Sequence, residues 1–412
     1  MFNQQLEAFE KFSKLKIGAL FMQMGTGKTR IALELINYNN VDFLIYLTPF
    51  STKNNIQAEF DKWGVNCPYE IVGYETIQSS DRVYLELIKK CTGKKCFIIA
   101  DESIFIKNEE TKRFDRALQL RKLCEYALVL NGTPLTKSEW DLYNQMYFLS
   151  PLIINMNRND FLTTFFTHVK YKKKGQKEKE FYKFSEINAK ALHKMIEPYV
   201  FKADLDFGMN EQKEMHYVPY LGGEYYTQKE DALEKLRKEQ NPCPATILAL
   251  LTKLNVVASS YNKKLDKIIE YAKDKQLIIY CNYLAEADYL KKNMDCYIIT
   301  GDTKEKHRTG IIDGFKYDNN PLVMTYGVGS CSLNLQFCNE IVYSSINFVY
   351  SLMEQSQYRI KRIGQERDIK YTYFLTDLGI NKIILENLTK KQDLSKLIKD
   401  EINIKNYLEV NL

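Results

Sequence analysis

The sequence lacks the cysteine pattern of a metal-binding or disulfide-linked protein. Its nine cysteines include no C-x-x-C spacing. The nearest pairs are Cys91 with Cys96 and Cys331 with Cys338, and neither pair has companion histidines at metal-ligand intervals. We therefore expect reduced thiols that are mostly buried.

Long apolar runs are also missing. No stretch approaches the length that a membrane span needs. Near the amino terminus, Glu7 and Glu10 stand where a secretory signal would place an apolar run. Low-complexity segments and internal repeats of short period are absent as well. These absences predict a cytoplasmic globular protein that does not bind membranes.

The chain length and the charge balance leave room for a polyanionic partner. The 412 residues are 45% hydrophobic, which allows sizeable cores and suggests two or three domains. Lysine and arginine exceed aspartate and glutamate by 58 to 52, giving a net charge of +6. This excess permits binding to nucleic acid without demanding it, because many ordinary enzymes are equally basic.

A phosphate-binding loop is indicated at 21–30, which reads FMQMGTGKTR. An apolar run precedes the glycines, and the apolar residues of the following RIALELI have helical spacing. Met22 stands where the strict P-loop pattern has a glycine, but the rest of the chemistry is intact. The expected cofactor-binding residues of the loop are Gly25, Thr26, Gly27, Lys28 and Thr29.

Each residue type in this loop has a physical role in holding phosphates. The glycines let main-chain N–H groups turn inward at the positive end of the helix. Lys28 is expected to reach the β- and γ-phosphates, and Thr29 to ligate Mg2+. The alternative is a glycine-rich turn without a ligand, in which a lysine followed by threonine would have little structural purpose.

A second acidic site follows on a later strand. In KCFIIADESIFIKN, the apolar run 97–100 predicts a buried strand with Asp101 and Glu102 at its carboxyl end. In open parallel α/β sheets, that end binds ligands. Asp101 is expected to hold Mg2+, directly or through a water, and Glu102 to orient the attacking water. Adjacent carboxylates are often merely solvated, but here the phosphate loop lies upstream.

Two further segments carry candidate residues. YALVLNGTP predicts a strand that ends in a small polar turn containing Thr133. Later, EQSQYRIKRIGQ spaces Gln355, Arg359 and Arg362 at intervals of four and three, which predicts that they share one helix face. Arginines on that face would stabilise charge on a transferring phosphoryl group. A solvated basic helix is the alternative for this segment in isolation.

As an ordered set, these motifs resemble a known motor core. MGTGKT, DES followed by IKN, LNGTPLT and QSQYRIKRIGQ are similar to the motifs of superfamily two helicases. Lys107 and Asn108 after DES, and the IGQ that follows Arg362, resemble the Swi/Snf-related branch more than the DEAD-box RNA helicases. Weaker matches lie between the motifs and in the second half, so the resemblance covers nearly the whole chain.

The resemblance implies ATP and Mg2+ as cofactors and assigns further residues. Gln5 sits where the family has its adenine-sensing glutamine, and Gly329 joins the cofactor-binding set. The implied catalytic residues are Lys28, Asp101, Glu102, Gln355, Arg359 and Arg362. The implied nucleic-acid-contacting or coupling residues are Lys53, Asn55, Thr76, Thr133, Gly301 and Asn334.

The chain departs from the family pattern at two places. TYGVGSCSLNL has Ser332 where the family has a glycine, and YSSINFVYSLMEQ has Ser345 and Phe348 near the usual aspartate and WNP triplet. With the small size, these departures resemble the compact helicases of phages and mobile elements. We therefore predict a role in DNA replication, recombination or repair in a phage-infected or bacterial cell, with replication or recombination proteins as candidate partners.

The alternation of strands and helices predicts an α/β fold of two tandem RecA-like lobes. Lobe 1 is expected at 1–205, with an inserted hairpin at about 165–185 whose tip carries lysines. A helical protrusion or connector is expected at 206–262, and lobe 2 at 263–412. ATP is expected in the cleft between the lobes, so that closure depends on the γ-phosphate. For the lysine tip, a solvated loop is the alternative.

The leading interpretation is a monomeric ATP-dependent DNA translocase or helicase. It would bind duplex, forked or single-stranded DNA through phosphate contacts, without sequence preference. An RNA helicase remains open, because the sequence shows no independent reader of the ribose 2′-hydroxyl. An ATP-gated binding protein that does not translocate also remains open, although intact Glu102, Arg359 and Arg362 argue against it.

Overall fold

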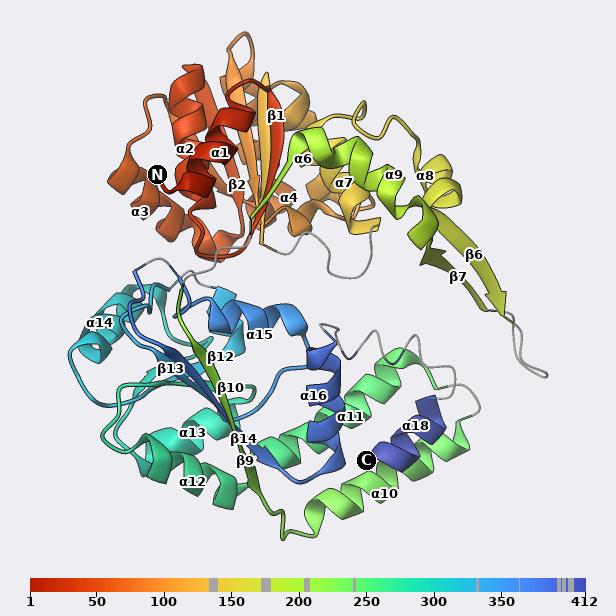
Figure 1. The fold of residues 1–412 in the computed structure, drawn as a ribbon, viewed down its shortest axis with the longest axis vertical. Helices are drawn as coiled ribbons and strands as arrows, with labels where there is room; N and C mark the ends of the chain where they lie inside the picture. Colours follow the sequence, from red (N-terminus) through yellow and green to blue (C-terminus); the bar gives the residue numbers. More distant parts are fainter. Residues whose placement is uncertain are drawn as a thin grey trace. The chain divides into compact units, whose positions relative to one another are not determined.

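The computed structural model divides the chain into two compact units, Met1–Leu205 and Asp206–Leu412 (Figure 1). Each unit has its own sheet and its own core, and each is described by itself. The structure describes residues 1–132, 140–171, 179–203, 208–239, 242–330, 333–362, 364–390, 394, 398 and 404–412.

The first unit is built on a six-stranded parallel sheet in the order β3-β2-β4-β5-β1-β8. Its strands are nearly continuous apolar runs, as expected where helices cover both faces of a parallel sheet. They are β1 (Ile17–Met22), β2 (Phe43–Thr48), β3 (Tyr69–Gly73), β4 (Cys96–Asp101), β5 (Tyr126–Asn131) and β8 (Val200–Ala203).

Alternate strand residues of the first unit enter two separate apolar layers. Ala19 and Ile45 belong to one layer, and Leu20 and Leu44 to the other, because successive side chains of a strand point to opposite faces. The covering helices are α1 (Asn3–Phe12), α2 (Lys28–Asn39), α3 (Lys53–Trp63), α4 (Tyr74–Ser79), α5 (Asp81–Cys91), α6 (Lys112–Lys122), α7 (Trp140–Leu149), α8 (Arg158–Phe165) and α9 (Glu186–Ile196).

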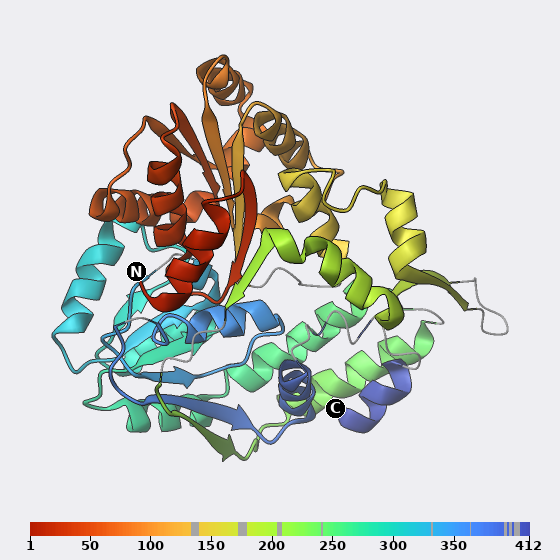
Figure 2. The ribbon, with the colours of Figure 1, turned by 45° about the horizontal axis from the view of Figure 1, so that its top comes forward.

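The predicted hairpin forms between α8 and α9. Strands β6 (Phe166–Tyr171) and β7 (Lys179–Phe184) pair antiparallel, with Phe166 opposite Phe184. Figures 1 and 2 show the hairpin extending beyond these two helices of the first unit. The lysine-rich tip at 172–178 lies outside the described residues, so the structure does not bear on its predicted role.

The second unit has a six-stranded parallel sheet in the order β11-β12-β10-β13-β14-β9. Its edge strand β9 comes from the segment expected as a helical connector, and it pairs with β14 along its eight residues. The strands are β9 (Glu211–Val218), β10 (Ile278–Cys281), β11 (Tyr297–Ile299), β12 (Leu322–Thr325), β13 (Glu340–Tyr343) and β14 (Ile369–Thr376). Two parallel α/β units confirm the predicted fold class.

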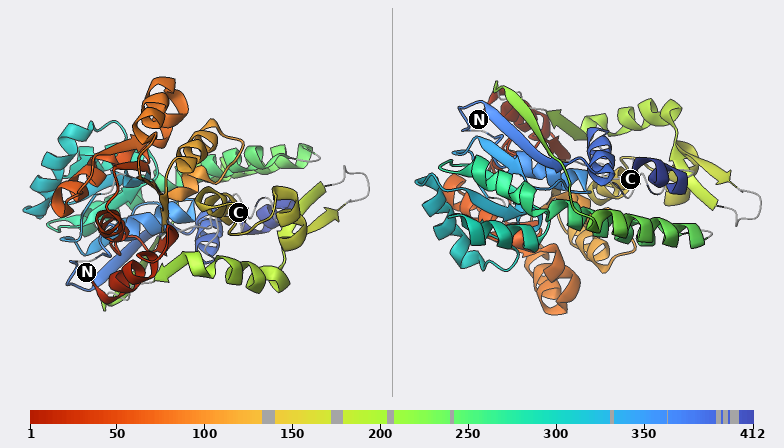
Figure 3. Two further views of the ribbon diagram at one scale, coloured as in Figure 1. Left: turned by 90° about the horizontal axis from the view of Figure 1, so that it is seen from above. Right: turned by 90° about the horizontal axis from the view of Figure 1, so that it is seen from below.

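The rest of the expected connector forms two long helices that pack within the second unit. Helices α10 and α11 pack against each other, α16 packs against α11, and α18 lies beside α10 (Figure 3, right). Helices α12 and α13 supply the core on the other face of the sheet. The helices are α10 (Glu224–Lys238), α11 (Pro244–Ser259), α12 (Asn262–Ala272), α13 (Leu284–Asn293), α14 (Glu305–Lys316), α15 (Tyr350–Gln357), α16 (Gly379–Thr389) and α18 (Ile404–Asn411).

The described part of the chain has neither a membrane-spanning helix nor a disulfide bond. None of its helices combines the length and the apolar character needed to cross a bilayer. Its eight cysteines are free thiols, and the buried ones are Cys91, Cys96, Cys124, Cys281 and Cys338.

Candidate nucleotide-binding site

The loop between β1 and α2 has the backbone that its glycines allow. Gly25 and Gly27 have φ values of 78° and 83°, in the left-handed region where a side chain is strained. A Cβ on Gly27 would also come within 2.2 Å of Gln5 Nε2. Gly27 is the N-cap of α2, and no side chain caps this helix. The first N–H groups of α2 are thereby arranged as in anion-binding helix starts.

The side chains of the loop are held by its own carbonyl groups. Lys28 Nζ donates hydrogen bonds to the Met22 and Gln23 carbonyl oxygens at 2.9 and 3.1 Å. The fully buried Thr26 donates its hydroxyl hydrogen to Gln23 O at 2.7 Å. Bound phosphates would replace these carbonyls as partners of the Lys28 ammonium group.

Gln5 links α1 to the phosphate loop. Its Nε2 donates to Thr26 O at 2.8 Å, and its Oε1 accepts from the Phe2 N–H at 3.0 Å. The side chain is buried. The structure thus places Gln5 against the loop, and its predicted role in sensing adenine stays a prediction.

One of the two residues predicted to bind Mg2+ is held by a tyrosine, and the other lies close to the same tyrosine. Tyr46, on β2, donates its hydroxyl hydrogen to Asp101 Oδ2 at 3.1 Å, and its phenol interacts electrostatically with the Thr29 side chain. Burial, followed by repulsion from Glu102, raises the pKa of Asp101 to about 7, while the charge of Lys28 opposes this rise. No sequence pattern singles out Tyr46, because it stands among the apolar residues of a buried strand.

The donor set at this site fits Mg2+. A threonine hydroxyl and a carboxylate are hard oxygen ligands, and Mg2+ bound with a nucleotide takes its remaining ligands from phosphates and waters. A bound cation would also offset the repulsion between Asp101 and Glu102. Consistent with such a sparse site, the described residues contain no cluster of three or more His, Cys, Asp or Glu side chains that could hold a metal alone.

Glu102 has a backbone conformation that is uncommon outside glycine. Its φ and ψ are 50° and 55°, in the left-handed region. Its N–H donates to Asp101 Oδ1 at 3.0 Å, and its carbonyl accepts from Phe105 N at 3.0 Å, at the start of the short helix Ser103–Ile106. Strained residues of this kind are concentrated at functional sites, where the surrounding structure holds them in place.

A buried polar cluster lies directly behind the acidic pair. Ser103 Oγ donates to Gln145 Oε1 at 2.5 Å, and Asn131 Nδ2 lies 3.4 Å from both of these oxygens. Gln145 comes from α7, so this cluster joins the ends of β4 and β5 to that helix. In the sequence, Gln145 is recognisable only as a polar residue within a largely apolar helix. Thr133, predicted to couple this region to nucleic acid, lies outside the described residues.

Three predicted nucleic-acid contacts gather at one edge of the first sheet. Lys53 and Asn55 lie on α3 after β2, and Thr76 lies on α4 after β3, which is the neighbouring strand. The two segments touch, because Phe50 N donates to Glu75 Oε2 at 3.0 Å. The predicted residues therefore lie at the same edge of the sheet, and their contact with nucleic acid stays a prediction.

The corresponding edge of the second sheet holds the other predicted contacts. Gly301 follows β11, and Gly329 lies in the short helix Tyr326–Ser330 after the neighbouring strand β12. Asn334 lies farther along the same segment, where its Oδ1 accepts a hydrogen bond from Arg362 Nη1. Arg362 also donates to Leu333 O at 3.3 Å. A predicted catalytic arginine and a predicted nucleic-acid contact are thus bound to each other.

The prediction that Gln355, Arg359 and Arg362 share one helix face is wrong. Helix α15 ends at Gln357, so only Gln355 is helical, and both arginines lie in the turns that follow. The chain leaves the helix because Ile360 is fully buried and Leu335 N donates to Arg359 O at 3.2 Å. Arg359 itself is buried and lies close enough to Tyr280 to interact with it electrostatically.

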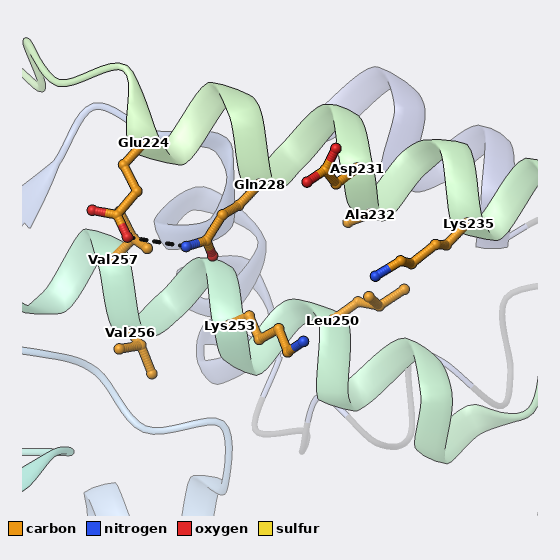
Figure 4. Close-up of a pocket in the computed structure, with 9 residues that line it drawn as sticks. All are labelled: Glu224, Gln228, Asp231, Ala232, Lys235, Leu250, Lys253, Val256 and Val257. Carbon is orange, nitrogen blue, oxygen red and sulfur yellow. Dashed lines mark hydrogen bonds between the residues drawn. The ribbon is translucent and has the colours of Figure 1, made fainter.

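A cavity in the second unit lies between α10 and α11 and has a volume of about 400 Å³ (Figure 4). Within it, Gln228 Nε2 donates to Glu224 Oε1 at 3.0 Å. Its remaining lining residues are Asp231, Ala232, Lys235, Leu250, Lys253, Val256 and Val257. None of the predicted site residues is among them.

The first unit has a glycine-rich phosphate loop and an acidic pair at one edge of its sheet, and the second α/β unit carries the two arginines predicted to be catalytic. The chain belongs to the SNF2-related family, since the model of the SNF2-related domain matches residues 44–255. The helicase conserved C-terminal domain matches residues 260–364.

Individual relatives are distant. The ATP-dependent helicase YqhH of Bacillus subtilis is 25% identical over 345 residues, which are 74% of this chain and 60% of that protein. The chromatin-remodelling subunit snf22 of Schizosaccharomyces pombe is 23% identical over 92% of this chain and 26% of its own length. This chain therefore spans less than two thirds of the length of either relative. The SWI2/SNF2 ATPase core of Sulfolobus solfataricus, solved with dsDNA, is 19% identical over 99% of this chain and 94% of that one, with a TM-score of 0.43.

Proposed function

We propose that this protein is an ATP-dependent DNA translocase or helicase, which couples ATP hydrolysis in the first unit to movement along DNA. The observation that carries the proposal is that the phosphate loop and the acidic pair lie close to one tyrosine. Asp101, at the end of β4, accepts a hydrogen bond from Tyr46, and Thr29, at the start of α2, lies close enough to interact with the same phenol. The glycine backbone of the phosphate loop and the strained backbone of Glu102 lie at the same edge of the sheet. Together these groups support nucleoside triphosphate chemistry.

In the proposed reaction, each residue of the first unit does a separate task. The N–H groups at the start of α2 bind phosphate oxygens, and Lys28 exchanges its carbonyl partners for the β- and γ-phosphates. Thr29 and Asp101 would hold Mg2+, which neutralises charge on the phosphates when it is bound. Glu102 orients the attacking water and polarises it, because phosphoryl transfer depends mainly on positioning and on charge stabilisation.

We propose that Arg359 and Arg362 of the second unit stabilise the negative charge on the transferring phosphoryl group. They would contact this group when the units close on ATP. Closure can be driven by ATP only if ATP binds the closed state more tightly than the open state. Arginines that contact the γ-phosphate only in the closed state provide that difference. The bond between Arg362 and Asn334 would then carry the state of the nucleotide to a proposed nucleic-acid contact.

We propose DNA as the polymer, bound by its phosphates at the edges that hold Lys53, Asn55 and Thr76 in one unit and Gly301 and Asn334 in the other. Family membership favours DNA over RNA, since the matching model is that of SNF2-related proteins. Phosphate contacts carry no sequence information, so binding should be non-specific and should weaken with salt. We further propose a role in replication, recombination or repair of a phage or mobile element. The identity of the genes that neighbour this one would test that role.

The test is steady-state ATP hydrolysis by the purified protein, measured alone and with single-stranded DNA, duplex DNA, forked duplex or RNA at two salt concentrations. Lys28→Ala serves as the inactive control. Stimulation by DNA that weakens with salt supports the proposal, and the most effective form shows which one is tracked. Stimulation by RNA alone would favour an RNA helicase, and hydrolysis that ignores every nucleic acid would favour an ATP-gated binding protein.

A further inference from the structure

Tyr46 is a polar residue at the centre of an otherwise apolar strand. It lies on β2, which is paired on both sides, and its side chain is fully buried. The ring packs edge-on against Phe60 of α3, with centroids 5.4 Å apart and planes at 82°. Phe60 in turn packs edge-on against Tyr69, at 4.8 Å and 71°. These contacts hold the ring in one position, so the position of its hydroxyl group is also set by the core.

The hydroxyl group of Tyr46 meets an element that is distant in the sequence. It donates to Asp101 Oδ2 at 3.1 Å, and the Thr29 side chain at the start of α2 lies close enough to interact with it electrostatically. A buried phenol needs a polar partner, and here that partner is the carboxylate of a proposed Mg2+ ligand.

The main chain of Asp101 is held by a different tyrosine. Tyr74, which is also fully buried, donates its hydroxyl hydrogen to Asp101 O at 2.8 Å. One tyrosine therefore binds the backbone carbonyl of Asp101, and the other binds its carboxylate. The Asp101 carboxylate is thus held at both oxygens, by the Glu102 N–H at Oδ1 and by the Tyr46 hydroxyl group at Oδ2.

We propose that Tyr46 is a positioning residue of the Mg2+–nucleotide site, whose hydroxyl group orients the Asp101 carboxylate before the nucleotide binds. The inference rests on the proposed function, because it takes Thr29 and Asp101 as the Mg2+ ligands. Partners that orient metal ligands contribute strongly to metal affinity, and their removal weakens it by about 10- to 100-fold. A residue that only fills the core would affect stability and leave metal binding unchanged.

The experiment compares Tyr46→Phe with Tyr69→Phe in the full-length protein. Both changes remove one hydroxyl group from the same stack of aromatic rings, but the Tyr69 hydroxyl meets only Gln57 Nε2, at 2.7 Å. Binding of a non-hydrolysable ATP analogue is measured by calorimetry, once with Mg2+ and once with EDTA. The dissociation constant measured with EDTA, divided by the one measured with Mg2+, reports how strongly Mg2+ strengthens nucleotide binding. This ratio is obtained without any turnover.

The expected result is that Tyr46→Phe lowers this ratio by about tenfold or more, keeps metal-free nucleotide binding, and requires a higher Mg2+ concentration for half-maximal binding. Tyr69→Phe should keep the wild-type ratio. A Tyr46→Phe protein with the wild-type ratio would overturn the inference, and so would equal losses in both variants. If the wild-type protein binds no nucleotide even with Mg2+, the proposed function itself fails; if it binds and Tyr46→Phe changes nothing, only the role of Tyr46 fails.

Discussion

Replacing Glu286 by glutamine would remove one charge from a buried ion pair in the second unit. Glu286 lies at the start of α13 and is fully buried, and Lys264 of α12 is 1% exposed. The Lys264 ammonium lies 3.9 Å from Glu286 Oε2 and donates to Ser344 O. The Glu286 carboxylate accepts hydrogen bonds from the main-chain N–H groups of Asn282 and Tyr283 and from the hydroxyl groups of Ser344 and Ser345.

The magnitude follows from this geometry. At an effective dielectric constant of about 20, opposite charges 3.9 Å apart attract each other by about 4 kcal/mol. Measured losses from breaking a buried pair are similar, about 3–5 kcal/mol, because the remaining charge is left buried without compensation. Burial already lowers the pKa of Lys264, so this lysine is poorly placed to remain charged alone. The loss is a large part of a typical domain stability of about 5–15 kcal/mol.

The assay uses the distribution of tryptophan. The sequence has two tryptophans, Trp63 and Trp140, and both lie in the first unit. Tryptophan fluorescence therefore follows urea unfolding of the first unit, while far-ultraviolet circular dichroism follows both units. Glu286→Gln should move the dichroism transition of the second unit down by about 1–2 M urea and leave the fluorescence transition in place.

The matched control is Glu270→Gln, which breaks an exposed pair on the same helix as Lys264. Lys267 Nζ lies 2.8 Å from Glu270 Oε2, and exposed pairs of this kind contribute little to stability because solvent screens them. If Glu286→Gln shifts the transition no more than Glu270→Gln does, the buried pair does not stabilise the second unit as argued. A shift of the fluorescence transition would also contradict the argument, because it would place the effect in the first unit.

Three further predictions concern the candidate site. Glu102→Gln should keep binding of an ATP analogue and reduce kcat by about 10²- to 10⁴-fold, measured by single turnover, because it removes the group that positions the water. Arg362→Ala should lower kcat by about 10³-fold or more while changing nucleotide affinity much less, and an equal loss in both would contradict a role in the transition state. Asp101→Asn should change how stability depends on pH. The folded-state pKa of Asp101 is raised to about 7, above its unfolded value, so the wild-type native state binds the proton more tightly and loses stability as pH rises from about 4 to about 8. Asparagine does not titrate, so the stability of the variant relative to the wild type, measured by tryptophan-monitored urea unfolding, should rise by about 4 kcal/mol between the two pH values. A difference that is the same at both pH values would refute the assignment.

The sequence alone determined those features that depend on neighbouring residues. Apolar runs such as 97–100 specify buried strands, and helical spacing after Lys28 specifies α2. The left-handed turns of the phosphate loop require glycine, so Gly25 and Gly27 indicated the loop even though Met22 breaks the strict pattern. Parallel strands then bring their carboxyl ends to one edge, which is why Asp101 was expected near the loop.

The tertiary structure decided what depends on contacts between distant segments. Tyr46 and Asp101 are 55 positions apart, and no local pattern shows that the tyrosine hydroxyl would reach the carboxylate. The spacing of Gln355, Arg359 and Arg362 fits a helix, but α15 ends at Gln357. The chain turns there because Ile360 is buried and because the residues around it form hydrogen bonds to the 333–338 segment.

The same reason explains the edge strand β9 and the backbone of Glu102. Strand β9 (Glu211–Val218) is mostly exposed, and it is a strand because β14 offers it a free sheet edge more than 150 positions later in the chain. The left-handed φ of Glu102 is maintained by its bonds at the end of β4, because glutamate has no intrinsic preference for it. Local propensity and periodicity therefore specified which elements form, and long-range packing determined which side chains meet.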